Sequence, residues 1–194
     1  MPVHSKTKHP KKGLSWLEKI VIAIVLIVVI WGAYSLLQPA PPPTTPVKTG
    51  DAPEFGPLQV VNANGLTGDK ISLSSFRGKI VLLEFMLPSC VHCQNIAPQL
   101  ETLYKQFGSD NLVFISVAGQ SPGEGPNDVA NFIKSYHSSW IYVYDSSNMA
   151  FTKYGVQATP TFFIIGKNGQ VLTSCDQGDS CAQTLSDDLK RINV

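Results

Sequence analysis

Apolar and polar positions divide the chain into two parts. Residues 20–37 carry no formal charge and are apolar around almost the full circumference of a helix, whereas residues 55–194 alternate between short apolar runs and amphipathic segments. Short apolar runs bounded by turn residues predict buried strands, and apolar residues three and four positions apart predict helices. The pattern therefore predicts one long apolar helix followed by an α/β domain around a mixed sheet.

Strands and helices are expected to alternate in the second part. The expected strands are Leu58–Val61, Ile71–Leu73, Ile80–Met86, Leu112–Val117, Trp140–Tyr144, Thr161–Ile165 and Gln170–Leu172. The expected helices are Gln94–Phe107, a helix that Asp128 caps and that ends at Tyr136, a short one over Met149–Tyr154, and Ala182–Ile192. The first two strands should form a hairpin, and Asn168-Gly169 favours a type I′ turn between the last two.

The apolar helix is flanked as a membrane-spanning helix is. Its eighteen residues would cover about 27 Å, close to the roughly 30 Å hydrocarbon core of a bilayer. Lysines gather in residues 1–19, which by the positive-inside rule places the N-terminus in the cytoplasm. We therefore predict a basic cytoplasmic tail over residues 1–19, a transmembrane signal-anchor helix over residues 20–37, and an extracytoplasmic domain. A cleaved signal peptide stays open as the alternative, since Ala33-Tyr34-Ser35 is a small-x-small sequence.

Composition bounds the rest of the organisation. Residues 38–52 are rich in proline and predict an extended linker, which leaves residues 53–194 for the domain. The formal net charge is +1, but the basic residues gather before the apolar helix and the domain is mildly acidic. A basic nucleic-acid-binding surface is therefore not expected, and we predict no nucleic-acid partner.

Cys90-Val91-His92-Cys93 stands where the predicted strand Ile80–Met86 gives way to a helix. The unpaired N–H groups and the dipole of a helix N-terminus favour a thiolate at the first cysteine. The second sulfur lies one turn inside the helix, close enough to close a small disulfide ring. This arrangement predicts thiol–disulfide exchange, with a permanent disulfide or half of a zinc site as the alternatives.

Three segments carry a resemblance to a known family. Residues 81–93 resemble the active-site strand and helix start of the thioredoxin fold, with Pro98 where the family kinks this helix, and residues 154–165 resemble the strand of its cis-proline. Residues 65–79 resemble the N-terminal hairpin of the TlpA/ResA-like branch. The resemblance covers about residues 53–194. It implies a thioredoxin-like α/β fold, with a central mixed sheet flanked by helices and an N-terminal hairpin extension. The proteins of that branch are membrane-tethered thiol–disulfide oxidoreductases that face away from the cytoplasm.

The resemblance also implies roles for individual residues. Cys90 would be the attacking nucleophile and Cys93 the resolving thiol. Thr159 and Pro160 would form the cis pair beside the active disulfide, where the backbone of Thr159 could bind an extended substrate segment. Glu84 matches the buried acid of thioredoxins and could take or relay the proton of Cys93. The alternative is a carboxylate that points toward solvent or pairs with Lys79.

Three further side chains bear on the direction and stability of the site. His92 beside the first cysteine would stabilise a thiolate and so favour an oxidising couple, as in DsbA-like proteins, unless it is a plain surface residue. Cys175 and Cys181 are expected to form a structural disulfide outside the cytoplasm. A second redox-active pair is the alternative role for these two cysteines.

These features predict a thiol–disulfide oxidoreductase that acts on exported cysteine-containing proteins and is recycled by a membrane redox partner. We expect no cofactor and no bound metal. The direction is undecided, with oxidation or isomerisation favoured over a reductant for cytochrome c maturation. A copper-delivery module is the non-enzymatic alternative, but that family separates its cysteines by three residues rather than two. Peroxide chemistry is disfavoured because Leu87 stands where peroxiredoxins carry threonine.

Overall fold

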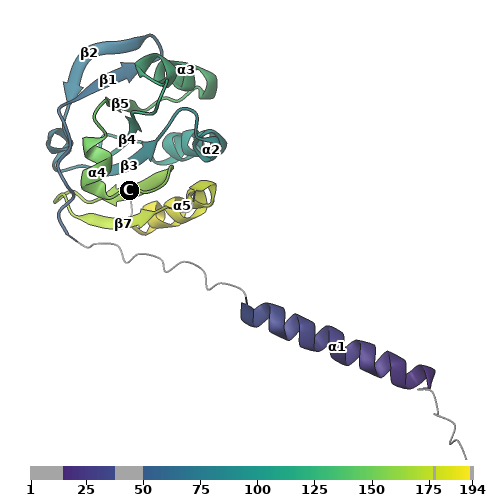
Figure 1. Cartoon of the computed structure of the whole chain (residues 1–194). Coiled ribbons are helices and arrows are strands. Elements are labelled where there is room, and N and C mark those ends of the chain that lie inside the picture. Colours follow the sequence, from purple (N-terminus) through teal and green to yellow (C-terminus); the bar gives the residue numbers. More distant parts are fainter. Residues whose placement is uncertain (1–14, 38–49, 177, 193–194) are drawn as a thin grey trace, which may run out of the picture. The chain divides into compact units, whose positions relative to one another are not determined.

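The computed structural model describes residues 15–37, 50–176 and 178–192 (Figure 1). The chain divides into two compact units, residues 1–45 and residues 46–194, and each is described by itself. Most of the predicted tail and most of the predicted linker lie outside the described residues.

The first unit contains helix α1, Trp16–Leu37. A capping box starts it: the backbone N–H of Ser15 donates to the Glu18 carboxylate at 2.7 Å, and the N–H of Glu18 donates to the Ser15 hydroxyl at 3.4 Å. Within the described part of the chain, no helix has both the length and the apolar character that crossing a membrane requires. The helix over residues 20–37 is thus present, and its prediction as a membrane span is not confirmed.

The second unit is built on one mixed sheet of seven strands in the order β2-β1-β5-β4-β3-β6-β7. The strands are β1 Leu58–Asn62, β2 Gly65–Ile71, β3 Ile80–Met86, β4 Leu112–Gly119, β5 Ile141–Asp145, β6 Thr161–Ile165 and β7 Val171–Cys175. The helices are α2 Val91–Phe107, α3 Pro126–Tyr136, α4 Met149–Tyr154 and α5 Cys181–Ile192, with short 3₁₀ turns η1 Leu73–Phe76 and η2 Gly178–Ser180. Strands β3, β4 and β5 run parallel and the other neighbours antiparallel, which confirms the predicted mixed sheet.

Helices cover both faces of this sheet (Figure 1). On β3 the even-numbered side chains Leu82 and Met86 pack in the layer that α2, α3 and α5 complete. The odd-numbered side chains pack on the other face, where Phe85 meets Phe151 of α4 with ring centroids 5.1 Å apart. Since successive side chains of a strand alternate between faces, Glu84 falls on the α2 side between Leu82 and Met86. A carboxyl group therefore interrupts the apolar layer directly beneath α2.

Several predicted elements differ from the structure in their bounds, and two of these differences have a clear physical reason. Strand β2 covers Gly65–Ile71 rather than Ile71–Leu73, because it is an edge strand whose middle residues are exposed and carry no apolar pattern. Helix α2 begins at Val91 rather than Gln94, because Cys90 caps it and the dithiol motif forms its first turn.

Candidate active site

Cys90 lies at the N-terminus of α2 and touches two backbone groups from different parts of the chain. The backbone N–H of Cys93 donates to Cys90 Sγ at 3.4 Å, and the Cys90 thiol donates to the carbonyl oxygen of Thr159 at 3.2 Å. Cys90 is half-buried, and both cysteines of the motif are free, so the structure shows the dithiol form. The first cysteine is thus the one that a substrate can reach.

Cys93 is fully buried, within a cluster that includes Met86 and Ala97. Burial raises the pKa of the Cys93 thiol far above its ordinary value, and the negative charge of Glu84 raises this pKa further. A thiol in this position stays protonated near neutral pH. It becomes a nucleophile only if a nearby base takes its proton.

Glu84 is the buried carboxyl that acts electrostatically on Cys93. Its side chain is 2% exposed, and it accepts a hydrogen bond from the Ser116 hydroxyl. Desolvation raises the pKa of Glu84 to about 7, against the opposing effect of the Ser116 hydrogen bond. Both protonation states of Glu84 are therefore accessible near neutral pH, as a group that takes and returns a proton requires.

Thr159 and Pro160 are joined by a cis peptide bond, as the sequence predicted, and immediately precede β6. Pro160 is buried and Thr159 is half-buried. The carbonyl of Thr159 faces Cys90 across 69 positions of sequence, which brings the two motifs together.

The structure contains a disulfide between Cys175 at the end of β7 and Cys181 at the start of α5. The short loop that it closes reaches the dithiol motif, because a side-chain carbon added to Gly178 would lie 3.6 Å from Cγ of His92. His92 is exposed and lies in the first turn of α2, so the loop borders the site on that side. Sequence reasoning did not foresee this contact, and no pattern in the sequence signals it.

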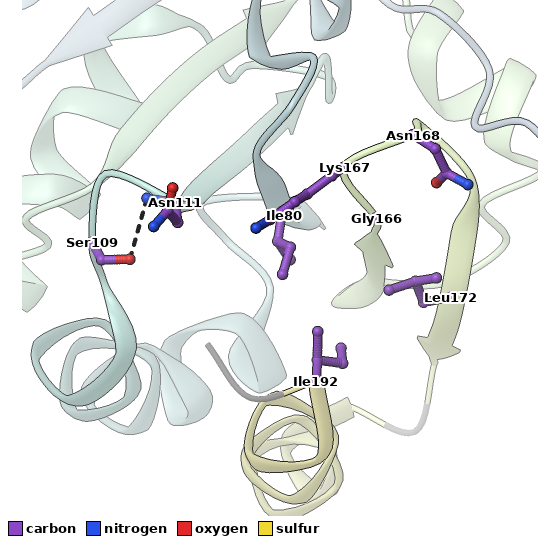
Figure 2. A pocket seen from close by; sticks show the side chains of 8 residues that line it. All are labelled: Ile80, Ser109, Asn111, Gly166, Lys167, Asn168, Leu172 and Ile192. Atoms are coloured by element: carbon purple, nitrogen blue, oxygen red, sulfur yellow. Dashed lines mark hydrogen bonds between the residues drawn. The ribbon is translucent and has the colours of Figure 1, made fainter.

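One pocket of the domain lies away from the dithiol. This pocket of about 470 Å³ opens beside Ile80, the first residue of β3 (Figure 2). Cys90 follows the opposite end of that strand. The lining of the pocket is completed by Ser109, Asn111, Gly166, Lys167, Asn168, Leu172 and Ile192. Among the described residues, no group of three or more His, Cys, Asp or Glu side chains could hold a metal ion.

Comparisons with known proteins agree with this site. A model of the AhpC/TSA family matches residues 51–174. The thiol-disulfide oxidoreductase ResA of Bacillus thuringiensis subsp. konkukian is 31% identical over 127 residues, which are 66% of this chain and 71% of that protein. ResA of Bacillus subtilis is 34% identical over 122 residues, or 63% of each chain.

Solved structures show the same fold. The thioredoxin domain of a thiol-disulfide oxidoreductase from Bacteroides vulgatus has a TM-score of 0.60 at 21% identity, over 73% of this chain and 96% of that one. StoA from Bacillus subtilis has a TM-score of 0.56 at 23% identity, over 70% and 96%. The predicted thioredoxin-like fold is confirmed.

A half-buried thiol at a helix start, a buried partner thiol and this fold define a thioredoxin-fold thiol–disulfide oxidoreductase. With residues 51–174 matched, the chain belongs to the AhpC/TSA family, in its TlpA/ResA-like branch.

Proposed function

We propose that this protein exchanges disulfides with exported cysteine-containing proteins through a mixed disulfide at Cys90 that Cys93 resolves. The observation that carries the proposal is the 3.2 Å contact between Cys90 Sγ and the Thr159 carbonyl. It sets the accessible thiol against the backbone of Thr159, with which an extended substrate segment can pair strand to strand. Thr159 and Pro160 are thus proposed as the substrate-binding residues.

In the reducing direction, the Cys90 thiolate attacks one sulfur of a substrate disulfide. An S–S bond forms between Cys90 and that sulfur, and the other substrate sulfur leaves as a thiolate that takes a proton from water. Cys93 then loses its proton to Glu84 and attacks Cys90 Sγ, which releases the second substrate thiolate. The enzyme ends as the Cys90–Cys93 disulfide, two electrons having passed to the substrate.

In the oxidising direction the same steps run backward. A substrate thiolate attacks Cys90 of the enzyme disulfide, and Cys93 leaves as a thiolate that takes its proton from Glu84. A second substrate thiolate then attacks the substrate sulfur of the mixed disulfide and releases Cys90. Glu84, buried and with a pKa of about 7, serves as proton acceptor in one direction and donor in the other.

His92 supports oxidation or isomerisation as the favoured direction, because an imidazole beside Cys90 stabilises its thiolate and hence the reduced enzyme. The reduction potential of the full chain against glutathione tests this direction. A value near about −120 mV would support a donor of disulfides, and a value near about −270 mV would support a reductant, such as one serving cytochrome c maturation.

We propose an extracytoplasmic location for the domain of residues 53–194, with an anchor over residues 20–37, a cytoplasmic N-terminus, and a membrane redox partner that recycles the dithiol. Lysines before the apolar helix support this orientation, and the Cys175–Cys181 disulfide is of a kind that persists in oxidising compartments. Protease added to intact cells should remove the domain and leave a short N-terminal fragment. Full protection of the domain would overturn this location.

Trapping tests the mechanism directly. A Cys93→Ser variant should accumulate mixed disulfides with substrate proteins through Cys90, and Cys90→Ser should form none. Stoichiometric copper binding by the full chain, without turnover of a disulfide substrate, would replace the enzyme by a metal-delivery module.

A further inference from the structure

A chain of three side chains ends on the carboxyl group that faces Cys93. The indole N–H of Trp140 donates to the Ser116 hydroxyl oxygen at 2.7 Å, and the Ser116 hydroxyl donates to Glu84 Oε2. Ser116 has no exposed surface, and it is the neighbour of Glu84 in the register of β3 and β4. The three groups therefore form a polar line, half-buried at Trp140 and fully buried at Ser116 and Glu84, that runs from the residue before β5 to the middle of β3.

The indole N–H of Trp140 fixes the direction of both hydrogen bonds in this series. An indole nitrogen can only donate a hydrogen bond, whereas a serine hydroxyl has one proton and two acceptor positions. Since Trp140 occupies an acceptor position of Ser116, the single proton of Ser116 remains for the Glu84 oxygen. A hydroxyl that donates to a carboxylate stabilises its ionised form, and such charge-assisted bonds are stronger than neutral ones.

The other groups around Glu84 do not take over this role. On the two neighbouring strands, Phe162 of β6 pairs with Glu84 and Tyr142 of β5 pairs with Ser116. The phenylalanine ring has no hydroxyl. The Tyr142 hydroxyl donates to Ser138 at 3.0 Å and also lies within hydrogen-bonding reach of the Ser116 hydroxyl, so it touches Ser116 and not the carboxylate. From α2, Cys93 faces Glu84, and the Glu84 charge makes ionisation of Cys93 and of Tyr142 harder. Ser116 is the hydroxyl that meets the carboxylate in this layer.

We propose that Ser116 and Trp140 are positioning residues of the resolving step, which together stabilise the ionised form of Glu84 so that it can accept the proton of Cys93 near neutral pH. The proposal rests on the proposed function of Glu84 as the proton acceptor. Trp140 acts through Ser116, and Ser116 acts through Glu84, so neither touches the reacting sulfurs. Without the line, the buried carboxyl would hold its proton to a higher pH, and Cys93 would have no base at neutral pH.

The pH dependence of the resolving step tests this role. Single-turnover rates of the full chain with a disulfide-containing peptide should rise with pH through an inflection that reports Glu84. Ser116→Ala should move this inflection upward by about one pH unit or more, which is about a tenfold loss of rate below it. Trp140→Phe, which frees the acceptor position but keeps the hydroxyl, should move it upward by less. Ser174→Ala on β7 is the matched control and should leave the inflection in place.

Two further variants distinguish the positioning role of Ser116 and Trp140 from the role of Glu84 as proton acceptor. Glu84→Gln should remove the inflection, and Ser116→Ala added to Glu84→Gln should change nothing more. An inflection that survives Glu84→Gln would overturn the role of Glu84 itself. A second outcome would overturn the positioning role alone. In it, Glu84→Gln removes the inflection, but neither Ser116→Ala nor Trp140→Phe, both folded, displaces it. The carboxyl ¹³C shift of Glu84 provides the same pKa without turnover, and an equal pKa in wild type and Ser116→Ala would also overturn it.

Discussion

The two cysteine pairs of this domain are similar in placement and different in state. Cys90 caps α2 and Cys181 begins α5, so each pair has a sulfur at a helix start. Cys90 is half-buried and free, beside the Thr159 carbonyl, whereas Cys181 is fully buried and bonded to Cys175. A helix N-terminus is therefore not what distinguishes a reactive thiol here. Three other features distinguish the first pair. Cys90 is accessible to solvent, the Thr159 backbone lies beside it for a substrate, and the buried carboxyl of Glu84 lies near Cys93.

The largest effect should come from removing the accessible sulfur. Cys90→Ser leaves no nucleophile at the substrate-facing position, so insulin-disulfide reduction by the full chain should fall to the uncatalysed rate. Cys175→Ser with Cys181→Ser, which removes the other pair, should keep the rate within several-fold of wild type. Loss of turnover in this second variant, with the fold intact, would make the pair at α5 a redox-active one.

A large effect on stability should come from the buried carboxyl near the first pair. Burial raises the pKa of Glu84 to about 7 from its ordinary value of 4.5, so the native state favours the protonated acid. Below the ordinary pKa of 4.5, Glu84 is protonated in both the folded and the unfolded state. As pH rises from there through about 7, the domain should lose up to about 3 kcal/mol of unfolding free energy from this group. Glu84→Gln should lack this part of the decline when urea unfolding is measured at pH 4.5 and pH 8. A parallel decline in both proteins would contradict the assignment.

A smaller loss of stability should follow from opening the second pair. Cys175→Ser with Cys181→Ser releases a short loop, and the chain-entropy cost predicts a loss of about 2 kcal/mol. Urea unfolding of the full chain, read by the fluorescence of the domain, measures this difference. Cys90→Ser in the dithiol pair serves for comparison. It breaks no disulfide bond in the reduced protein and should change the free energy of unfolding by much less.

The smallest effect should couple the two pairs. Because Gly178 of the disulfide loop lies against the His92 ring, opening the loop should alter how His92 is held beside Cys90. His92→Ala should lower the reduction potential of the dithiol by about 30 mV, a tenfold change in the equilibrium constant. Opening the disulfide should shift the potential by less, and Val91→Ala, an exposed change in the same helical turn, should not shift it. Equal potentials in all these variants would mean that the loop and the imidazole have no influence on the dithiol.

The sequence predicted those parts of the fold that have a simple pattern. Strand β3 is buried along its whole length and β4 at every residue but Val113, and both read as nearly continuous apolar runs. The two motifs at Cys90 and Thr159 also predict their own local geometry. Strand β2 was predicted with the wrong bounds, because an exposed edge strand needs no apolar residues. The role of Ser116 could not be seen in advance either. A single serine inside an apolar run acquires meaning only when the register sets it beside Glu84.

The location of Glu84 on β3 has a consequence for motion as well as for chemistry. Its backbone pairs with β4 on one side and β6 on the other, in the middle of the sheet. Residues of central strands exchange their amide hydrogens mainly when the entire domain unfolds, whereas edges and termini open locally. Local opening therefore does not hydrate this carboxyl. Its amide should be among the slowest to exchange, and its elevated pKa should persist up to the temperature at which the domain melts.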